Sequence, residues 1–289
     1  MADHLSYSQV HTLGSCGWQY YLQRETDTPQ RPSTPAVAGR VIHTASEAVD
    51  HKLFGLEQGH HPWDMSQQGE LREELLALAS SASEQSFGEE LKEHLVNEKY
   101  PDVSDWRSYG RSTKEKPNAE DIYWFRDVGI PAANEAYVDW RLANPNLQIY
   151  VLPDGSPAIE VEFNIQIGER AVRGYIDRVF IDRTNKSPLI VDLKSGGKPD
   201  TDEQLGVYRY ALEATYGLPF VWGAYLYALK KGGVLTAPIS LEHWTEEQLV
   251  YKYGVANKMI QQKLFLPNPG PGCFHCGVSD SCLFNAANI

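Results

Sequence analysis

The chain has 289 residues, 42% of them apolar, which is enough for one large domain with a normal buried core. It contains no run of 18 apolar residues and no basic N-terminal stretch followed by an apolar one, so we expect neither a membrane span nor secretion. The net charge of −12 argues against avid nonspecific binding to a polyanion, but residues 168–200 carry a local net charge of +2, with 7 Lys and Arg against 5 Asp and Glu.

The N-terminal half is predicted to be helical. Helices are expected over residues 5–24, 36–54, 71–80, 88–98 and 119–143, the last with a break or kink at Pro131. A proline-rich stretch at 26–35 separates the first two. Residues 51–121 are acidic, with 15 Asp and Glu against 8 Lys and Arg. We interpret the helices between residues 51 and 143 as an insertion or lid.

The pattern changes to strands after residue 158. Residues 159–167 alternate strictly between apolar and polar, which is typical of a half-buried strand with Glu160 on its polar face. Helices followed by the order β-β-β-α-β-α predict a mixed α/β core. The further strands are expected over 172–182, 188–194 and 220–229, and the helices over 202–216 and 245–263. The four expected parts are N-terminal helices (1–55), a mainly helical insertion (56–157), the core (158–265) and a C-terminal cysteine motif (266–289).

A charged pair lies on one apolar strand, in the stretch LIVDLK that ends at Lys194. Side chains alternate along a strand, so Asp192 and Lys194 point to the same face. Charges in such a place are costly unless they are paired or bind a metal. Taken alone, the segment is also explained by a strand end that emerges into solvent, or by a local ion pair.

Asp177 lies on the preceding strand among apolar residues, and the turn at 182–187 is expected to bring the two strands together. Two carboxylates on adjacent strands can share one divalent cation, and oxygen ligands suit Mg²⁺ or Mn²⁺. Such a metal polarises a phosphoryl oxygen and lowers the pKa of an attacking water. Lys194 would position or deprotonate that water, or stabilise charge on the phosphate.

Three further residues extend this set. Gln204 and Tyr208 are four apart on an expected helix and therefore share a face, although a surface Gln and a core Tyr also explain them. His43 lies on a helix with Glu47 one turn further on, and imidazole suits Mn²⁺. A lone helical histidine is more often structural.

The joint pattern closely resembles the RecB-like nucleases of the PD-(D/E)xK superfamily. The resemblance covers residues 5–55, with the opening SYSQVHTLGSCGWQYYL and then AxxGRVIH, and residues 158–285, but nothing over 56–157. Ile176 stands where the family nominally has proline before the first aspartate. The motifs that carry it are Gly39-x3-His43, Gly174-x2-Asp177, Asp192-x-Lys194 and Gln204-x3-Tyr208.

The resemblance implies a nuclease core with a mixed central sheet flanked by helices, and it implies roles for the residues above. Lys194 would be catalytic, and Gln204 and Tyr208 would order Lys194 and the DNA. The implied ligands of Mg²⁺ or Mn²⁺ are His43, Asp177, Asp192 and the carbonyl of Leu193.

The resemblance also implies a substrate and a setting. It implies exonuclease action on single-stranded DNA with 5′ to 3′ polarity. A role in recombination, repair or CRISPR spacer acquisition, with protein partners in these processes, is implied by the family only. We expect a cytoplasmic protein of a bacterium or archaeon, or a phage-encoded one.

The four cysteines form a separate pattern, Cys16 and Cys273-x2-Cys276-x5-Cys282. Without a secretory signal they do not indicate disulfides. Thiolates so spaced bind Zn²⁺, with His275 as a further candidate, or an iron–sulfur cluster, and unrelated free thiols are the remaining alternative.

The split of one N-terminal and three C-terminal cysteines resembles the iron–sulfur branch of RecB-like nucleases, which includes AddB-type nuclease domains and the CRISPR-associated single-domain nucleases. That resemblance implies a [4Fe–4S] cluster that staples the two ends of the chain together, so its loss should destabilise the fold.

Two other functions remain open. A non-catalytic iron–sulfur DNA-binding or adaptor protein would keep the fold, but it need not keep Asp177, Asp192 and Lys194. A metal-dependent hydrolase would act on another substrate. Tyr123 and Trp140 belong to a set of aromatic residues that would stack bases in a channel or form the core of a helix. The chain carries no Walker A sequence, so no built-in helicase motor is expected.

Overall fold

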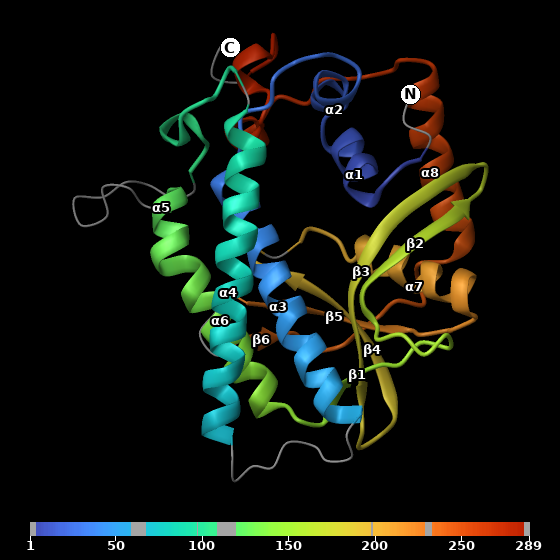
Figure 1. Cartoon of the computed structure of the whole chain (residues 1–289). Coiled ribbons are helices and arrows are strands. Elements are labelled where there is room, and N and C mark those ends of the chain that lie inside the picture. The colour runs from blue at the N-terminus through green and yellow to red at the C-terminus, as the bar shows by residue number, and fades with distance from the viewer. Residues whose placement is uncertain are drawn as a thin grey trace.

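The computed structural model of the chain describes residues 4–58, 68–96, 98–108, 120–197, 199–228 and 233–285. Within these residues the strands form one mixed sheet with helices packed on both of its faces (Figure 1). The mixed α/β class predicted from the sequence is therefore confirmed. The division into four parts stays a prediction.

The first half of the sheet is built around β3 (Arg170–Asp182), whose 13 residues make it the longest strand. It pairs antiparallel with β1 (Leu147–Ile149), β2 (Ile159–Ile167) and β4 (Ser187–Lys194). Because β3 is so long, one end can pair with β2 while the other pairs with β1 and β4. The strand therefore carries residues from the β2 hairpin into the centre of the sheet.

The second half of the sheet begins where β5 (Trp222–Tyr227) pairs in parallel with β4. Parallel neighbours need a crossover connection, and α7 (Glu203–Tyr216) provides it. The first turn of α7 is therefore placed close to the end of β4. The short strands β6 (Val234–Leu235) and β7 (Ile239–Ser240) pair antiparallel with β5. With two residues each, they show no alternation that a sequence pattern could reveal.

The N-terminal helices differ in one detail from the expected stretch over 5–24. Ser6 forms a capping box with Gln9 at the start of α1 (Tyr7–Ser15), and α2 (Gly17–Arg24) follows directly. The two helices are separated at Cys16, whose backbone is extended. This break frees the thiol of Cys16 from a regular helical position.

The long helices α3 (Thr34–Gln58) and α4 (Gln68–Leu95) lie side by side (Figure 1). The prediction of two helices, over 71–80 and 88–98, was wrong, since α4 runs through both. The small and polar residues in the middle of α4 have a weak propensity for helix when considered alone. Tertiary packing overrides that weak propensity, because α4 buries residues at helical spacing, namely Leu75, Ala79, Ser83, Ser86 and Phe87.

The helical stretch before the sheet is interrupted, as predicted, but ahead of Pro131. A short α5 (Ile122–Trp124) passes into a π-helical turn (Phe125–Gly129) and then into α6 (Ile130–Ala143). Pro131 lies in the first turn of α6, where its missing N–H costs no hydrogen bond.

The remaining helices lie near the C-terminus, apart from the single 3-10 turn Val103–Asp105. α8 (Glu246–Gln261) begins at Thr245, which forms a capping box with Gln248. Two 3-10 turns follow, at Pro271–His275 and Ser279–Ser281.

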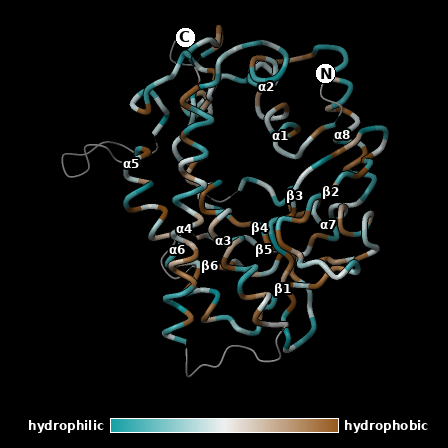
Figure 2. The backbone as a smooth tube through the Cα atoms, viewed as in Figure 1, coloured by the Kyte–Doolittle hydropathy of each residue, from teal (hydrophilic) through white to brown (hydrophobic). Residues whose placement is uncertain are grey.

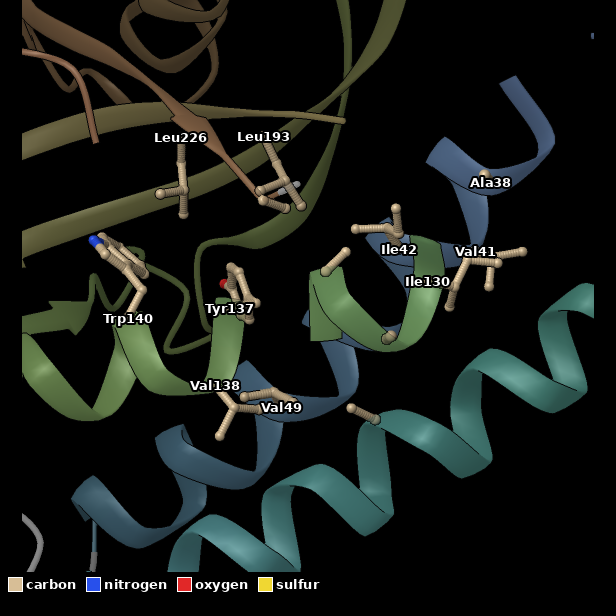
Figure 3. Packing of buried hydrophobic residues seen from close by; sticks show 14 of the residues in the cluster. Ala38, Val41, Ile42, Val49, Ile130, Tyr137, Val138, Trp140, Leu193 and Leu226 are labelled. Atoms are coloured by element: carbon tan, nitrogen blue, oxygen red, sulfur yellow. The ribbon is translucent and has the colours of Figure 1, made fainter. Parts of the chain in front are cut away.

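Two hydrophobic layers enclose the sheet. On one face, α3 and α6 pack against residues such as Val191, Leu193 and Leu226, and α4 packs against these two helices. Figure 3 shows Leu193 and Leu226 pointing from the strands toward Tyr137 and Trp140 of α6. On the other face, α1, α7 and α8 pack against residues such as Ile190. The alternation of β4 between the two layers explains its nearly continuous apolar sequence.

Helix α2 and the C-terminal cysteine segment lie close together. Leu22 of α2 packs with Cys276 and Val278, and Trp18 and Cys282 border this small cluster. Hydrophobic residues otherwise gather along the central strands (Figure 2). Among the described residues, no helix is both long and apolar enough to cross a membrane.

Candidate active site

Asp177 and Asp192 lie on the neighbouring strands β3 and β4, and both carboxylates are buried. Asp177 Oδ2 accepts a hydrogen bond from the backbone N–H of Leu193 at 2.7 Å. Lys194 Nζ lies 2.7 Å from Asp192 Oδ2, on the face that strand alternation predicted. The three residues are thus brought together by strand pairing alone.

Gln204 and Tyr208 extend from Lys194 in a chain of hydrogen bonds. Lys194 Nζ donates to Gln204 Oε1 at 2.9 Å, and Gln204 Nε2 donates to the hydroxyl of Tyr208 at 2.8 Å. Burial, followed by the charge of Asp177, raises the pKa of Tyr208 well above its usual value. A neutral tyrosine therefore anchors the amide that orients the lysine.

His43 reaches the same place from α3, on the opposite side of β4. Its Nδ1 lies 3.8 Å from Asp177 Oδ2, and its Nε2 lies 3.0 Å from the carbonyl oxygen of Leu193. The second distance fits an N–H···O hydrogen bond. It also fits two ligands on adjacent corners of an octahedron, since metal–ligand bonds of about 2.1 Å place such corners about 3.0 Å apart.

Glu160 is a site residue that the sequence pattern missed. The strand register pairs Ile159 with Arg178 and Val161 with Ile176, so Glu160 lies across from Asp177. Its Oε1 lies 3.6 Å from His43 Nδ1. Alternation placed Glu160 on the polar face and gave no reason to separate it from the other polar residues there. Only its position across from Asp177 in the β2–β3 hairpin distinguishes Glu160 from the other polar residues.

The backbone at Glu160 is unusual as well, with a φ of 45°. A non-glycine residue in this left-handed region carries a strain of roughly 1–2 kcal/mol, and such residues cluster at functional sites. The side chain and the backbone of Glu160 are therefore both held by their surroundings.

Negative charge is concentrated at the site. Burial, reinforced by the neighbouring Asp177, raises the pKa of Asp192 to about 7 although Lys194 opposes the shift. Burial likewise raises the pKa of Asp177. Burial works against a protonated His43, but the charge of Asp177 and the contact with Glu160 outweigh it and raise the pKa of His43.

These residues fit a divalent cation. One ligand atom each from His43, Glu160 and Asp177 lies within 4.8 Å of the others, and Asp192 is a further buried carboxylate on the neighbouring strand β4. Buried carboxylates are costly unless a cation compensates them. Carboxylate oxygens with one imidazole suit Mn²⁺ or Mg²⁺.

The four cysteines line a second site, a cavity of about 480 Å³. Backbone N–H groups donate to two of the thiols at 3.4 Å, from Asn268 to Cys16 and from Gly270 to Cys273. Burial raises the pKa of Cys276, and the nearby Cys282 and Cys16 add to this. No cysteine of the described residues forms a disulfide.

The fold and the first site together define a class of protein. A mixed sheet that holds two aspartates and a lysine at adjacent strands, with an oxygen-rich cation site beside them, is the arrangement of a metal-dependent nuclease. The chain belongs to the PD-(D/E)XK nuclease superfamily, whose family model matches residues 4–283. Membership indicates a nuclease that uses divalent metals and acts on DNA.

Two phage proteins are similar to this chain over nearly their whole length. The Gene 69 protein of Mycobacterium phage D29 is 30% identical over 294 residues, which cover 96% of this chain and 95% of that protein. The Gene 69 protein of Mycobacterium phage L5 is 28% identical over 300 residues, with the same shares of 96% and 95%. The iron–sulfur and CRISPR-associated branches remain predictions.

Proposed function

We propose that the protein is a metal-dependent nuclease that hydrolyses DNA phosphodiester bonds, as an exonuclease on single strands with 5′ to 3′ polarity. The observation that carries the nuclease proposal is the continuous contact from Asp177 through Leu193 and Asp192 to Lys194 and Gln204. The exonuclease action and its polarity are supported only by the resemblance to RecB-like enzymes, as is a role in recombination, repair or CRISPR adaptation.

The metal would be held by His43, Asp177, Asp192 and the Leu193 carbonyl, with Glu160 beside them. When bound, it would supply Lewis-acid polarisation of a phosphoryl oxygen and a more acidic water. The protein's own residues orient these groups: the Leu193 N–H fixes one carboxylate oxygen of Asp177, and β4 places its carbonyl beside His43.

Lys194 would act on the reacting phosphate. An ammonium group has three donors, and among the described residues two of them face Asp192 and Gln204. The third is left to bind the attacking water or a phosphate oxygen. Gln204 and Tyr208 keep the ammonium aimed at this position.

A cleavage assay tests the nuclease proposal. Labelled linear and circular single strands and duplexes are incubated with Mg²⁺, Mn²⁺ or EDTA. We expect wild type to cut with metal only, and Asp192→Ala and Lys194→Ala to be inactive. If both variants cut as well as wild type, the site is wrong. A folded wild type that binds DNA but never cuts it would support the non-catalytic adaptor instead.

The same assay tests the finer claims. For the proposed exonuclease, we expect labelled mononucleotides to be released from 5′-labelled strands before they are released from 3′-labelled strands. Circular strands should stay intact. Cleavage of circular strands would show an endonuclease, and early loss of the 3′ label would reverse the polarity.

We also propose that the cysteine cavity holds a [4Fe–4S] cluster. A tetrahedral Zn²⁺ with bonds of about 2.3 Å draws its four sulfurs to about 3.8 Å from one another. The four thiols here line a cavity of about 480 Å³, which has room for a larger group. The two N–H···S contacts also suit cluster sulfurs.

Anaerobic purification tests the cluster. We expect a brown protein with broad visible absorbance and about four iron and four sulfide per chain, lost in Cys273→Ser. A colourless protein with one zinc per chain would overturn the proposal.

A further inference from the structure

A buried carboxylate, Asp50, lies on α3 seven residues after His43, which is two helical turns. It is 0% exposed and accepts three hydrogen bonds. Its Oδ1 accepts from Arg141 Nε at 2.7 Å, and its Oδ2 accepts from Arg178 Nε at 2.6 Å and from the hydroxyl of Tyr137. Arg141 and Tyr137 come from α6, so Asp50 joins that helix to α3 and to the sheet.

Arg178 connects Asp50 to the metal site. It follows Asp177 on β3 and is 2% exposed. Its Nη1 donates to Glu160 Oε1 at 2.9 Å and to the carbonyl of Asp177 at 2.5 Å. Its Nη2 donates to Ser46 Oγ at 3.1 Å. One guanidinium therefore contacts the carboxylate of one site residue and the backbone of another.

Charge makes this arrangement interdependent. Arg141 and Arg178 share the single carboxylate of Asp50, so Glu160 supplies the second negative charge of the cluster. Breaking a buried ion pair leaves an uncompensated charge. Without Asp50, Arg178 would lose its anchor and would draw Glu160 away from His43. The left-handed backbone at Glu160 has to be held by contacts, and the ion pair with Arg178 is one of them.

We propose that Asp50 and Arg178 are positioning residues of the metal site, which hold Glu160 and Asp177 at the separation that a divalent cation requires. Tyr137 and Arg141 set the orientation of Asp50. This rests on the proposed function of the site as a metal centre. It assigns to α6 a direct part in building that centre, whereas the sequence pattern offered only base stacking by aromatic residues of this stretch.

Three variants and one matched control test this proposal. Tyr137→Phe removes one donor to Asp50 and keeps the ring and every charge, so it is expected to fold. Asp50→Asn and Arg178→Lys disrupt the contacts that link Asp50, Arg178 and Glu160 more strongly. In Arg178→Lys, the lysine cannot reproduce the forked hydrogen bonding of an arginine. The control is Asn134→Ala, also on α6, which removes a buried hydrogen bond to Ser83 Oγ at 2.8 Å and touches none of these groups.

The first measurement is Mn²⁺ binding to the full-length protein by calorimetry, alongside the thermal midpoint of each metal-free variant. We expect affinity to fall about threefold or more in Tyr137→Phe and about tenfold or more in the other two, which is the range for partners that orient metal ligands. Asn134→Ala should bind Mn²⁺ as wild type does, whatever its thermal midpoint. The proposal would be overturned if the Mn²⁺ affinities of the variants simply followed their thermal midpoints. It would also be overturned if Tyr137→Phe bound Mn²⁺ with wild-type affinity.

The second measurement is DNA cleavage as a function of Mn²⁺ concentration. Excess Mn²⁺ should restore the cleavage rate of Tyr137→Phe and Asp50→Asn but not that of Lys194→Ala. Failure of excess Mn²⁺ to restore either rate would count against a positioning role. A wild type that binds Mn²⁺ without cutting DNA overturns the nuclease proposal alone, because affinity still tests the positioning residues. A wild type that binds no Mn²⁺ overturns both.

Discussion

Lys194 shows at the residue scale how a charged side chain is kept in place on a buried strand. Asp192 compensates its charge, and Gln204 orients it through an amide whose other end is fixed by Tyr208. Each partner contributes in a different way. The carboxylate is a candidate metal ligand too, whereas the amide and the phenol serve only the lysine in this structure.

This difference predicts unequal effects of two substitutions. Gln204→Ala removes the direct partner of Lys194 and should lower kcat about tenfold, since a lost hydrogen bond to a charged group costs about 1.5–3 kcal/mol. Tyr208→Phe leaves that direct contact in place and should lower kcat only about twofold to threefold. Single-turnover cleavage at saturating Mn²⁺ measures both. A larger loss of kcat for Tyr208→Phe than for Gln204→Ala would contradict the order of the hydrogen bonds, which run from Lys194 through Gln204 to Tyr208.

Asp192 predicts a pH dependence of stability in the metal-free protein. Its pKa is raised from 3.8 in the unfolded chain to about 7 in the folded one, chiefly by burial. The folded protein thus binds this proton more tightly, so the stabilising contribution is full below the unfolded pKa and is lost as pH rises through the folded pKa.

The free energy of unfolding in EDTA should therefore fall between about pH 4 and about pH 7 in wild type, and fall less in Asp192→Asn. Urea titrations at several pH values measure this difference. Parallel profiles for the two proteins would show that Asp192 is not the group responsible.

At the scale of elements, the placement of α7 decides whether Gln204 reaches Lys194. Gly206 lies near the start of α7. A Cβ added there would come within 2.4 Å of the Trp244 ring. The bare backbone of Gly206 thus lets α7 lie against the loop that precedes α8. A side chain there would have to move either the helix or the indole ring.

Gly206→Ala should therefore destabilise the protein by about 1–3 kcal/mol, as overpacking of a core does. Gly254→Ala on α8 is the matched control, since nothing lies within 4 Å of its added Cβ. That control should stabilise by up to about 1 kcal/mol through helix propensity. Chemical denaturation measures both values. Equal shifts in the two variants would mean that α7 does not depend on this contact.

At the scale of the whole molecule, the metal site joins α3 to the β2–β3 hairpin and β4, which lie far from α3 in the sequence. A cation that binds only the folded chain stabilises it by mass action, by about 2.7 kcal/mol at a hundredfold excess over the dissociation constant.

Mn²⁺ should thus raise the thermal midpoint of wild type by several degrees, and should leave that of Asp177→Ala unchanged. Differential scanning fluorimetry with and without Mn²⁺ measures the shift. The same rise in Asp177→Ala would place the bound ion elsewhere.

The local periodicity of the sequence predicted several features of this protein. The alternation of a strand places Asp192 and Lys194 on one face, and the spacing of four in a helix pairs Gln204 with Tyr208, because both depend only on backbone geometry. The change from helices to strands near residue 158 follows from the same patterns. These features were readable without knowing what packs against what.

Other features were decided by tertiary contacts. Glu160 joins the site only through the register of β2 against β3, and α4 is one helix only because α3 and α6 bury its weak middle. The meeting of Asp50 with Arg178, Arg141 and Tyr137 depends on the packing of two helices on a sheet. No local pattern encodes these pairings, because the charges that compensate one another there come from segments far apart in the chain, and burial alone makes each depend on the other.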